Sequence, residues 1–458
     1  MKYRRSQVQS KAHALPQLRF EDQALTSFAG LVIFQKFFAS IDLKSQLRRC
    51  FEPRGRGKVF SPATVFLQLI VHLLLGFREL QDVRCYRDDP LVQRLLGLQR
   101  LPDVATVSRV MKQTTPESVE NLRRFLRTRV LDGLRTFPPV RVTLDFDGSV
   151  QSTQRRAEGT AVGFNKKKKG ARSYYPLFCT IAQTGQVLDV LHRPGNVHDS
   201  QGAQAFLLAC IAAVRAVLPH AVIEVRMDSA FFSDEIVGTL ARHNVEFTIS
   251  VPFERFVELK KMIEQRRRWH RVDSETSSFE AAWKPQCWDQ RFRFVFVRTR
   301  AKKQQKGPIQ LDLFVPYEYG YEFKVIVTNK TLQAQRVAAF HEGRGSQEGV
   351  FAELKSHCHL DYVPVRTLHG NQMYLLAGLF AYNLTRELQM QTTPPVRGTT
   401  AQRTCLWVFE KVGTFRKTLL HRAGRLSRPQ GLLTLTLSAN TWIKTRLLHI
   451  LDQIPAKA

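Results

Sequence analysis

The chain has 458 residues, of which 43% are hydrophobic and 10% aromatic, so it can build a folded core and is not a disordered polypeptide. It carries 69 Lys and Arg against 39 Asp and Glu, and the net charge of +30 favours a polyanionic partner, with nucleic acid first and an anionic membrane second. The most apolar run, residues 65–77, is too short to cross a membrane, and the start of the chain lacks an apolar signal core, so we expect a cytoplasmic protein without membrane segments.

Residues 1–135 predict a helical domain. Ser61 is a suitable N-cap for an apolar helix that has Pro62 at its first position. A shorter helix follows Asp103. It fits either the recognition helix of a helix-turn-helix or ordinary packing within a bundle. With the positive charge of the chain, this end is predicted to bind DNA.

Strand periodicity begins after residue 136. Residues 136–253 predict three strands, then a helix, a strand, a helix and a strand, which is the pattern of a mixed α/β sheet. Residues 254–320 are rich in Arg, Lys, Trp and Phe and are interpreted as an inserted subdomain. The α/β pattern resumes over 321–392. Residues 393–458 are expected to form a basic helical tail.

Acidic residues stand near the ends of two predicted strands. Asp145 and Asp147 lie two positions apart in VTLDFDGSV, so they share one face, and Asp228 ends the strand VIEVRMD. An ionised carboxylate at the edge of an apolar core is costly without a partner. Capping of the following turn is the alternative explanation for Asp228.

A third acid lies in the stretch HEGRGSQEGVFAELK. On a helix, Arg344, Glu348 and Lys355 would fall within one narrow sector, and a solvated salt-bridge face is the simplest explanation. Three carboxylates converging in a basic chain instead suggest Mg²⁺, which binds through a few carboxylates together with substrate phosphates. Two such ions can activate a nucleophile and stabilise a leaving oxygen in phosphodiester chemistry.

Several ordered motifs between about residues 140 and 385 carry a family resemblance. They are LDFDGSV, GFNKKKKGARSYYPLF, LHRPGNVHDS, VRMDSAFFSDEIV, VIVTN and GRGSQEGVFAELK. The chain resembles insertion-sequence DDE transposases of the broad IS4 group, and most closely their IS1380 branch. The resemblance implies an RNase H-like catalytic core with a mostly β insertion between the second and third acids, and a bacterial, nucleoid-associated location.

The same resemblance implies a catalytic and metal-binding triad of Asp147, Asp228 and Glu348. Asp147 is preferred because it directly precedes a small turn, and Asp145 is a further candidate metal ligand. The expected cofactor is Mg²⁺, with Mn²⁺ as a substitute and two ions in the site. The expected partners are double-stranded DNA, both terminal inverted repeats and target, and a second copy of the chain in a homodimer.

Basic and aromatic residues complete the predicted site. Arg344 and Lys355 would bind phosphates near the scissile bond, and His341 stands where the family has Tyr. A lysine run could grip the DNA backbone, although a solvated hairpin is the alternative. An insertion tryptophan could stack on an extruded base, although core packing is the alternative. The residues expected to contact DNA or support the site are Arg344, Lys355, His341, Lys166, Lys167, Lys168, Lys169, Arg172 and Trp288.

The sequence therefore predicts a DNA transposase that cleaves element ends and joins them to target DNA. Two alternatives stay open. One is a catalytically silent DNA-binding regulator derived from a transposase, and the other is an RNase H-like nuclease without strand transfer.

Overall fold

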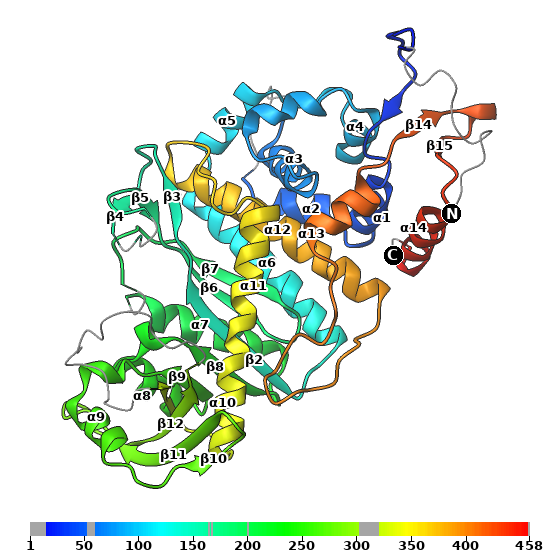
Figure 1. The fold of residues 1–458 in the computed structure, drawn as a ribbon. Coiled ribbons are helices and arrows are strands. Elements are labelled where there is room, and N and C mark those ends of the chain that lie inside the picture. The colour runs from blue at the N-terminus through cyan, green and yellow to red at the C-terminus, as the bar shows by residue number, and fades with distance from the viewer. Residues whose placement is uncertain are drawn as a thin grey trace.

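The computed structural model describes residues 15–52, 60–163, 165, 168–198, 201–301 and 320–456. Figure 1 shows a helical part above and a part built around a large sheet below, with long helices running between them. The segments nearest the two ends of the chain both lie in the upper part. No helix within these described ranges is long and apolar enough to cross a membrane.

The first part of the chain is helical, as the sequence predicts. Ser61 accepts a hydrogen bond from the Thr64 amide (3.1 Å) and Asp103 accepts one from the Thr106 amide (2.7 Å), so both predicted caps are confirmed. The helices pack around one apolar core. They are α1 (Leu31–Ser40), α2 (Leu43–Arg49), α3 (Pro62–Leu74), α4 (Pro90–Leu96), α5 (Val104–Lys112) and α6 (Pro116–Thr136), with a 3-10 segment at Leu80–Cys85.

A nine-stranded mixed sheet forms the lower part, in the order β10-β11-β12-β13-β9-β8-β2-β6-β7. The pairs β2–β8 and β8–β9 are parallel, and the other neighbours are antiparallel. The helices α7 (Ala203–Val217) and α8 (Asp234–Arg242) supply the crossovers. The strands are β2 (Arg141–Gly148), β6 (Leu177–Ile181), β7 (Gln186–Leu191), β8 (Val222–Met227), β9 (Glu246–Ser250), β10 (His270–Arg271), β11 (Thr276–Trp283), β12 (Phe292–Arg300) and β13 (Tyr321–Thr328).

The order of elements over 136–253 agrees with the prediction and confirms a mixed α/β architecture. One set of short strands was missed, because two or three residues are too few to show a periodicity. These strands form a separate three-stranded sheet: β3 (Gln151–Thr153), β4 (Ala161–Val162) and β5 (Arg172–Tyr174).

The expected insertion at 254–320 does not form a sheet of its own among the described residues. Its helix α9 (Val257–Glu264) packs on the core of the main sheet, and its strands β11 and β12 extend that sheet through β13. The Phe and Trp side chains that marked this region as distinct join the main core, with the rings of Phe279 and Phe296 stacked 4.3 Å apart.

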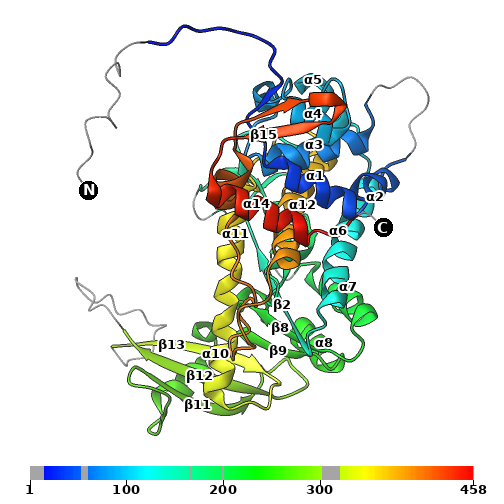
Figure 2. The same cartoon turned by 90° about the vertical axis from the view of Figure 1, so that its right-hand side faces the viewer.

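Three helices follow β13. They are α10 (Ala334–Glu342), α11 (Ser346–His357) and α12 (Leu368–Thr392), and a 3-10 turn, η5 (Gly343–Gly345), separates the first two. Figures 1 and 2 show α10 and α11 running from the sheet up to the helical part. Helix α12 is buried along most of its length against α3 and α6.

The prediction of a helical tail at 393–458 is wrong in part. Segment 393–411 carries no helix or strand and descends to the sheet before returning (Figure 1), where the Leu406 amide donates to the Gln183 carbonyl (2.9 Å). A β-hairpin then pairs with β1 (Leu25–Thr26) near the other end of the chain. The elements after this segment are α13 (Val412–Phe415), a π turn (Arg416–Leu420), β14 (Gly424–Ser427), β15 (Thr434–Leu437) and α14 (Thr441–Gln453).

A candidate active site at the ends of two parallel strands

Two of the predicted acids lie at the carboxyl ends of adjacent strands. Strands β2 and β8 run parallel, and their pairing ends with Asp145 opposite Arg226. Asp147 lies two residues further along β2, and Asp228 directly follows the last residue of β8. The Gly148 amide donates to Asp147 (2.8 Å), and the Ala230 amide donates to Asp228 (3.0 Å). Asp228 therefore caps the turn that follows β8, as the alternative explanation held.

The predicted cations and the third acid come from η5 and α11. A guanidinium nitrogen of Arg344 lies 3.1 Å from a carboxylate oxygen of Asp147, and both side chains are about one-fifth exposed. The next turn is fixed by Gln347, whose side-chain amide donates to the Asp145 carbonyl (3.0 Å). Glu348 follows Gln347 directly and is exposed on the first turn of α11. Arg344 thus contacts an acid of the sheet, and the turn η5 interrupts the continuous helix that the sequence predicts.

Asp145 is not placed to bind a metal ion. It is buried, and its two oxygens accept hydrogen bonds of 2.6 and 2.8 Å from the guanidinium of Arg226, which is also buried. Burial raises the pKa of Asp145 above its ordinary value, and the charge of Arg226 opposes that shift. The suggestion of Asp145 as a further metal ligand is therefore corrected, because both of its oxygens are already engaged.

The donor set at the strand ends suits a hard cation in its chemistry. Asp147 and Asp228 offer carboxylate oxygens, which Mg²⁺ prefers, from two neighbouring strands. Within the described part of the chain, however, no three His, Cys, Asp or Glu side chains are gathered closely enough to hold a metal ion. The residues therefore fit such an ion in type, and Glu348 is not drawn together with the two aspartates.

Two residues predicted to meet DNA are buried instead. His341 is 1% exposed and hydrogen-bonds to the hydroxyls of Ser250 (2.8 Å) and Thr248 (3.0 Å) on β9. Burial, followed by nearby cations, lowers the pKa of His341 well below its ordinary value, so the imidazole is neutral at pH 7. Trp288 is 5% exposed and packs against Phe232 with ring centres 4.8 Å apart. Neither side chain can contact a phosphate or a base in this conformation.

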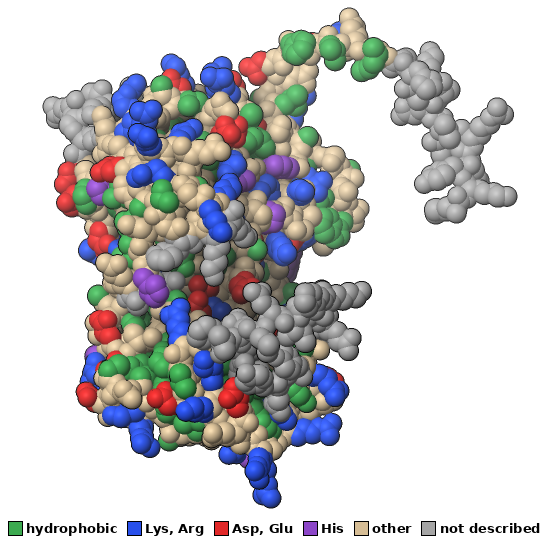
Figure 3. Space-filling view, turned by 60° about the vertical axis from the view of Figure 1, so that its left-hand side comes forward, with side chains coloured by type: hydrophobic (Ala, Val, Ile, Leu, Met, Phe, Trp, Pro, Cys, Tyr) green, Lys and Arg blue, Asp and Glu red, His purple; other side chains and the backbone are tan. Residues whose placement is uncertain are grey.

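The lysine run lies on the connection between β4 and β5. Lys168 and Lys169 are exposed, and Lys166 and Lys167 lie outside the described residues. Arg172 is also exposed, but its guanidinium donates to the Thr160 hydroxyl (3.0 Å), so part of it serves the small sheet. Figure 3 shows Lys and Arg side chains over both the helical and the sheet-containing parts of one face. Positive charge on that face is thus spread widely.

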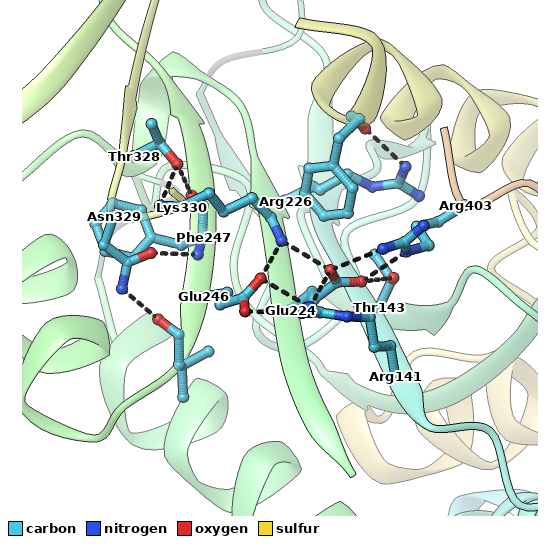
Figure 4. A network of polar contacts seen from close by, with 12 residues as sticks. Arg141, Thr143, Glu224, Arg226, Glu246, Phe247, Thr328, Asn329, Lys330 and Arg403 are labelled. Carbon is cyan, nitrogen blue, oxygen red and sulfur yellow. Dashed lines mark hydrogen bonds and ion pairs between the residues drawn. The ribbon is translucent and has the colours of Figure 1, made fainter. Parts of the chain in front are cut away.

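A second group of charges lies at the opposite, amino-terminal end of the same strands (Figure 4). Glu224 on β8 is fully buried and pairs with Lys330 (2.7 Å), Arg141 (2.8 Å) and Arg403 (3.0 Å). Burial alone would raise the pKa of Glu224, but Lys330 and Arg403 together lower it to about 2. Glu246 on β9 shares Lys330 and Arg141. Two acids therefore meet three cations inside the fold, and this cluster is a structural feature.

Sequence reasoning missed Arg226, Gln347 and the Glu224 cluster. The signal was present in β8, where Glu224, Arg226 and Asp228 alternate along an otherwise apolar strand and so share one face. A buried cation between two acids indicates a partner on a neighbouring strand, and Asp145 of β2 is that partner.

Comparisons with known proteins give one family model and several solved structures that resemble the chain. A family model described as "Transposase DDE domain group 1" matches residues 9–458. Among solved structures, the chain is similar to a piggyBac transposase synaptic complex with hairpin DNA, at 11% identity and a TM-score of 0.40 over 86% of this chain and 79% of that one. It is also similar to a Mos1 transposase paired-end complex with left transposon end, at 11% identity and a TM-score of 0.18 over 43% of this chain and 60% of that one. A search of curated proteins finds no match.

Proposed function

This chain belongs to the transposase family described as Transposase DDE domain group 1, and on that premise we propose that it cleaves the ends of a mobile DNA element and joins them to target DNA. The reaction would be metal-dependent phosphodiester hydrolysis followed by strand transfer. The observation that supports the proposal is the parallel pairing of β2 and β8, whose carboxyl ends carry Asp147 and Asp228, together with the contact of Arg344 with Asp147. We place the chain in the IS4 group, IS1380 branch, with an RNase H-like core.

The proposed catalytic residues are Asp147, Asp228 and Glu348. When bound, a pair of Mg²⁺ or Mn²⁺ ions would supply an activated water or 3′-hydroxyl and stabilise the leaving oxygen. The two aspartates would hold the metal from rigid strand ends. Glu348 would complete the set from the first turn of α11, where its side chain is exposed. We propose that Glu348 meets the two aspartates when DNA and the metal ions are bound.

The ion pair of Arg344 with Asp147 suggests how Arg344 would act on DNA. Its guanidinium pairs with Asp147 at 3.1 Å. A DNA phosphate would compete for this guanidinium, which binds phosphate as readily as carboxylate. We propose that Arg344 binds the phosphate near the scissile bond. Lys355, in the last turn of α11, would bind the adjoining DNA backbone. Lys166, Lys167, Lys168, Lys169 and Arg172 would extend that track.

The proposed partners follow from the charge and the reaction. The net charge of +30 suits a long duplex, and from the family membership we propose that the duplex comprises the terminal inverted repeats and the target DNA. Two ends have to be processed together, so we propose a homodimer.

The proposal is tested by end cleavage. The DNA flanking the coding region supplies the two candidate ends, which inverted repeats bounded by a short target duplication would identify. Labelled end DNA is incubated with protein in Mg²⁺ and in EDTA, and products are resolved on a denaturing gel. We expect cleavage at the repeat boundary in Mg²⁺ only, and its abolition by Asp228→Ala. Cleavage undiminished by that substitution would remove Asp228 from the mechanism.

One observation favours a second candidate function, a catalytically silent DNA-binding regulator. In the described residues the three acids are not gathered and Arg344 neutralises Asp147. A regulator would bind the terminal repeats without any Mg²⁺-dependent nicking. A nuclease without strand transfer would nick the ends but form no joined products when a target plasmid is added, so a target-plasmid assay beside the cleavage gel separates the three functions.

A further inference from the structure

Arg226 is a buried side chain that the proposed chemistry does not use. It lies on β8 two residues before Asp228, is 0% exposed, and pairs through two nitrogens with both oxygens of Asp145 on β2. Its remaining nitrogen, Nη1, donates to the Phe340 carbonyl (3.0 Å) and the Gln402 carbonyl (2.6 Å). One guanidinium therefore joins two sheet strands, the end of α10 and the returning segment 393–411.

The turn that follows α10 is built to fit against this guanidinium. A Cβ atom placed on Gly343 would lie 2.2 Å from Arg226 Nη1 and 1.9 Å from the Gln402 carbonyl oxygen, closer than real side chains approach. Gly343 is buried at the first position of η5 and has an ordinary backbone conformation. Glycine is required here for close approach and not for an unusual φ.

Two further contacts fasten the same turn to β2. Arg344, next to Gly343, reaches the carboxylate of Asp147 (3.1 Å), and Gln347 donates to the main-chain carbonyl of Asp145 (3.0 Å). Glu348 is the next residue. The position of Glu348 relative to the strand ends is thus set by a short path of contacts that starts at Arg226.

Stability alone is a weak explanation for this arrangement. A buried ion pair adds little net stability compared with apolar residues of the same volume, but it defines geometry closely because an unmatched buried charge is costly. A planar guanidinium with its nitrogens directed at two carboxylate oxygens and two carbonyls admits one arrangement of these segments.

We infer that Arg226 is a positioning residue for the reaction: it holds the η5 turn against β2 and β8 so that Glu348 can meet Asp147 and Asp228. It contacts neither DNA nor metal itself. The inference rests on the proposed function, and it adds Gly343 as the residue that makes the contact possible.

The primary test is a matched pair of glycine substitutions in the same turn. Gly343→Ala puts a methyl group into the Arg226 contact, whereas Gly345→Ala, two residues away, meets open space. Mn²⁺ binding is measured by electron paramagnetic resonance on the protein bound to end DNA, and cleavage is measured in parallel. We expect Gly343→Ala to weaken Mn²⁺ binding and slow cleavage by about 10- to 100-fold, as loss of a residue supporting metal ligands does. Gly345→Ala should stay within about twofold of the unsubstituted protein in both measurements.

A second pair of substitutions tests the inference if Gly343→Ala fails to fold. Arg226→Lys keeps a positive charge beside Asp145 but loses the two parallel hydrogen bonds of the guanidinium. Arg123→Lys makes the same change in the bidentate pair between Arg123 and the buried Asp189 on β7. Both should lower the thermal midpoint, and only Arg226→Lys should weaken Mn²⁺ binding. Unchanged Mn²⁺ binding in folded Gly343→Ala and Arg226→Lys would overturn the inference, as would an equal loss in Gly345→Ala. If the unsubstituted protein fails to cleave ends, the proposed function falls and the Mn²⁺ measurement still decides the role of Arg226.

Discussion

The two ends of strands β2 and β8 carry charged residues in opposite conditions. At the amino-terminal end, Glu224 is fully buried and shares three cations, so its charge is balanced within the fold (Figure 4). At the carboxyl end, Asp147 is partly exposed with Arg344 beside it, and Glu348 is exposed on α11. The same sheet thus keeps its structural charges at one end and presents acids at the other.

The difference in burial between the two ends separates acids that stabilise the fold from acids that can take part in a reaction. A buried acid with matched partners resists change, because removing any member leaves an unbalanced charge in a low-dielectric site. An acid near solvent can change partners when a phosphate or a cation arrives. Arg226 lies between the two ends and belongs to the structural side, although it acts on the position of the exposed acids.

The largest expected effect is on the exposed end. Glu348→Gln removes a proposed metal ligand, so end cleavage in Mg²⁺ should fall by roughly 10²- to 10³-fold, the equivalent of several kcal/mol of lost charge stabilisation. The thermal unfolding midpoint should not change, because the side chain is exposed. Glu342→Gln, an exposed acid at the end of α10, is the control and should cleave normally. Unchanged cleavage in Glu348→Gln would assign the third acid elsewhere.

The buried end should respond in the opposite way. Glu224→Gln leaves Arg403 without this acid and leaves Lys330 and Arg141 to share Glu246 alone. We expect the free energy of unfolding to fall by about 3 kcal/mol. Protein that stays folded should still cleave ends, because Glu224 is remote from the strand ends that carry Asp147 and Asp228. Denaturant unfolding measures the loss, and Glu235→Gln on the exposed face of α8 is the matched control. A stability equal to that of the unsubstituted protein would show that the cluster is neutral to folding.

Acid pH should reduce the difference in stability between the unsubstituted protein and Glu224→Gln. The pKa of Glu224 is lowered in the fold from 4.5 to about 2, so its contribution is complete above about pH 4.5 and is lost as the pH falls towards about 2. The stability gap between the unsubstituted protein and Glu224→Gln should therefore be constant from pH 7 to about pH 5 and narrow below that. Thermal midpoints of both proteins across this range check the sign. A gap that widens in acid would contradict a lowered pKa.

The smallest effect concerns Arg344. Its ion pair with Asp147 is partly exposed, so Arg344→Ala should change stability by less than about 1 kcal/mol. If Arg344 binds a phosphate, end-DNA affinity should fall and the slope of log affinity against log salt should decrease by about one contact. Arg336→Ala, an exposed arginine of α10, should leave both unchanged. An unaltered salt slope in Arg344→Ala would confine this residue to its contact with Asp147.

The sequence predicted those parts of the fold that are encoded locally. Strand alternation gave the order of β2, β6, β7, β8 and β9, and Ser61 and Asp103 marked helix starts because capping acts within three residues. The pairing of β1 with the hairpin β14–β15 could not be predicted, since its partners lie near opposite ends of the chain and have only two to four residues each.

In the candidate site, too, the local features were predicted and the contacts between distant segments were not. The acids at the ends of β2 and β8 followed from their position after apolar strands. The burial of His341 and Trp288 did not, because both lie in segments whose packing depends on β9 and on the extended sheet. The sequence preferred Asp147 to Asp145, but it did not show that Asp145 is held by Arg226, 81 residues further along the chain.

The central claim, that the strand-end acids hold the metal ions, is tested most directly by Asp228→Cys in a metal-exchange experiment. End cleavage is measured in Mg²⁺ and in Mn²⁺, with the unsubstituted protein active in both. A thiolate is a poor ligand for Mg²⁺ and a better one for Mn²⁺. The account predicts that Asp228→Cys is inactive in Mg²⁺ and recovers cleavage in Mn²⁺. Full activity of Asp228→Cys in Mg²⁺, or no recovery in Mn²⁺ while DNA binding and folding are intact, would contradict it.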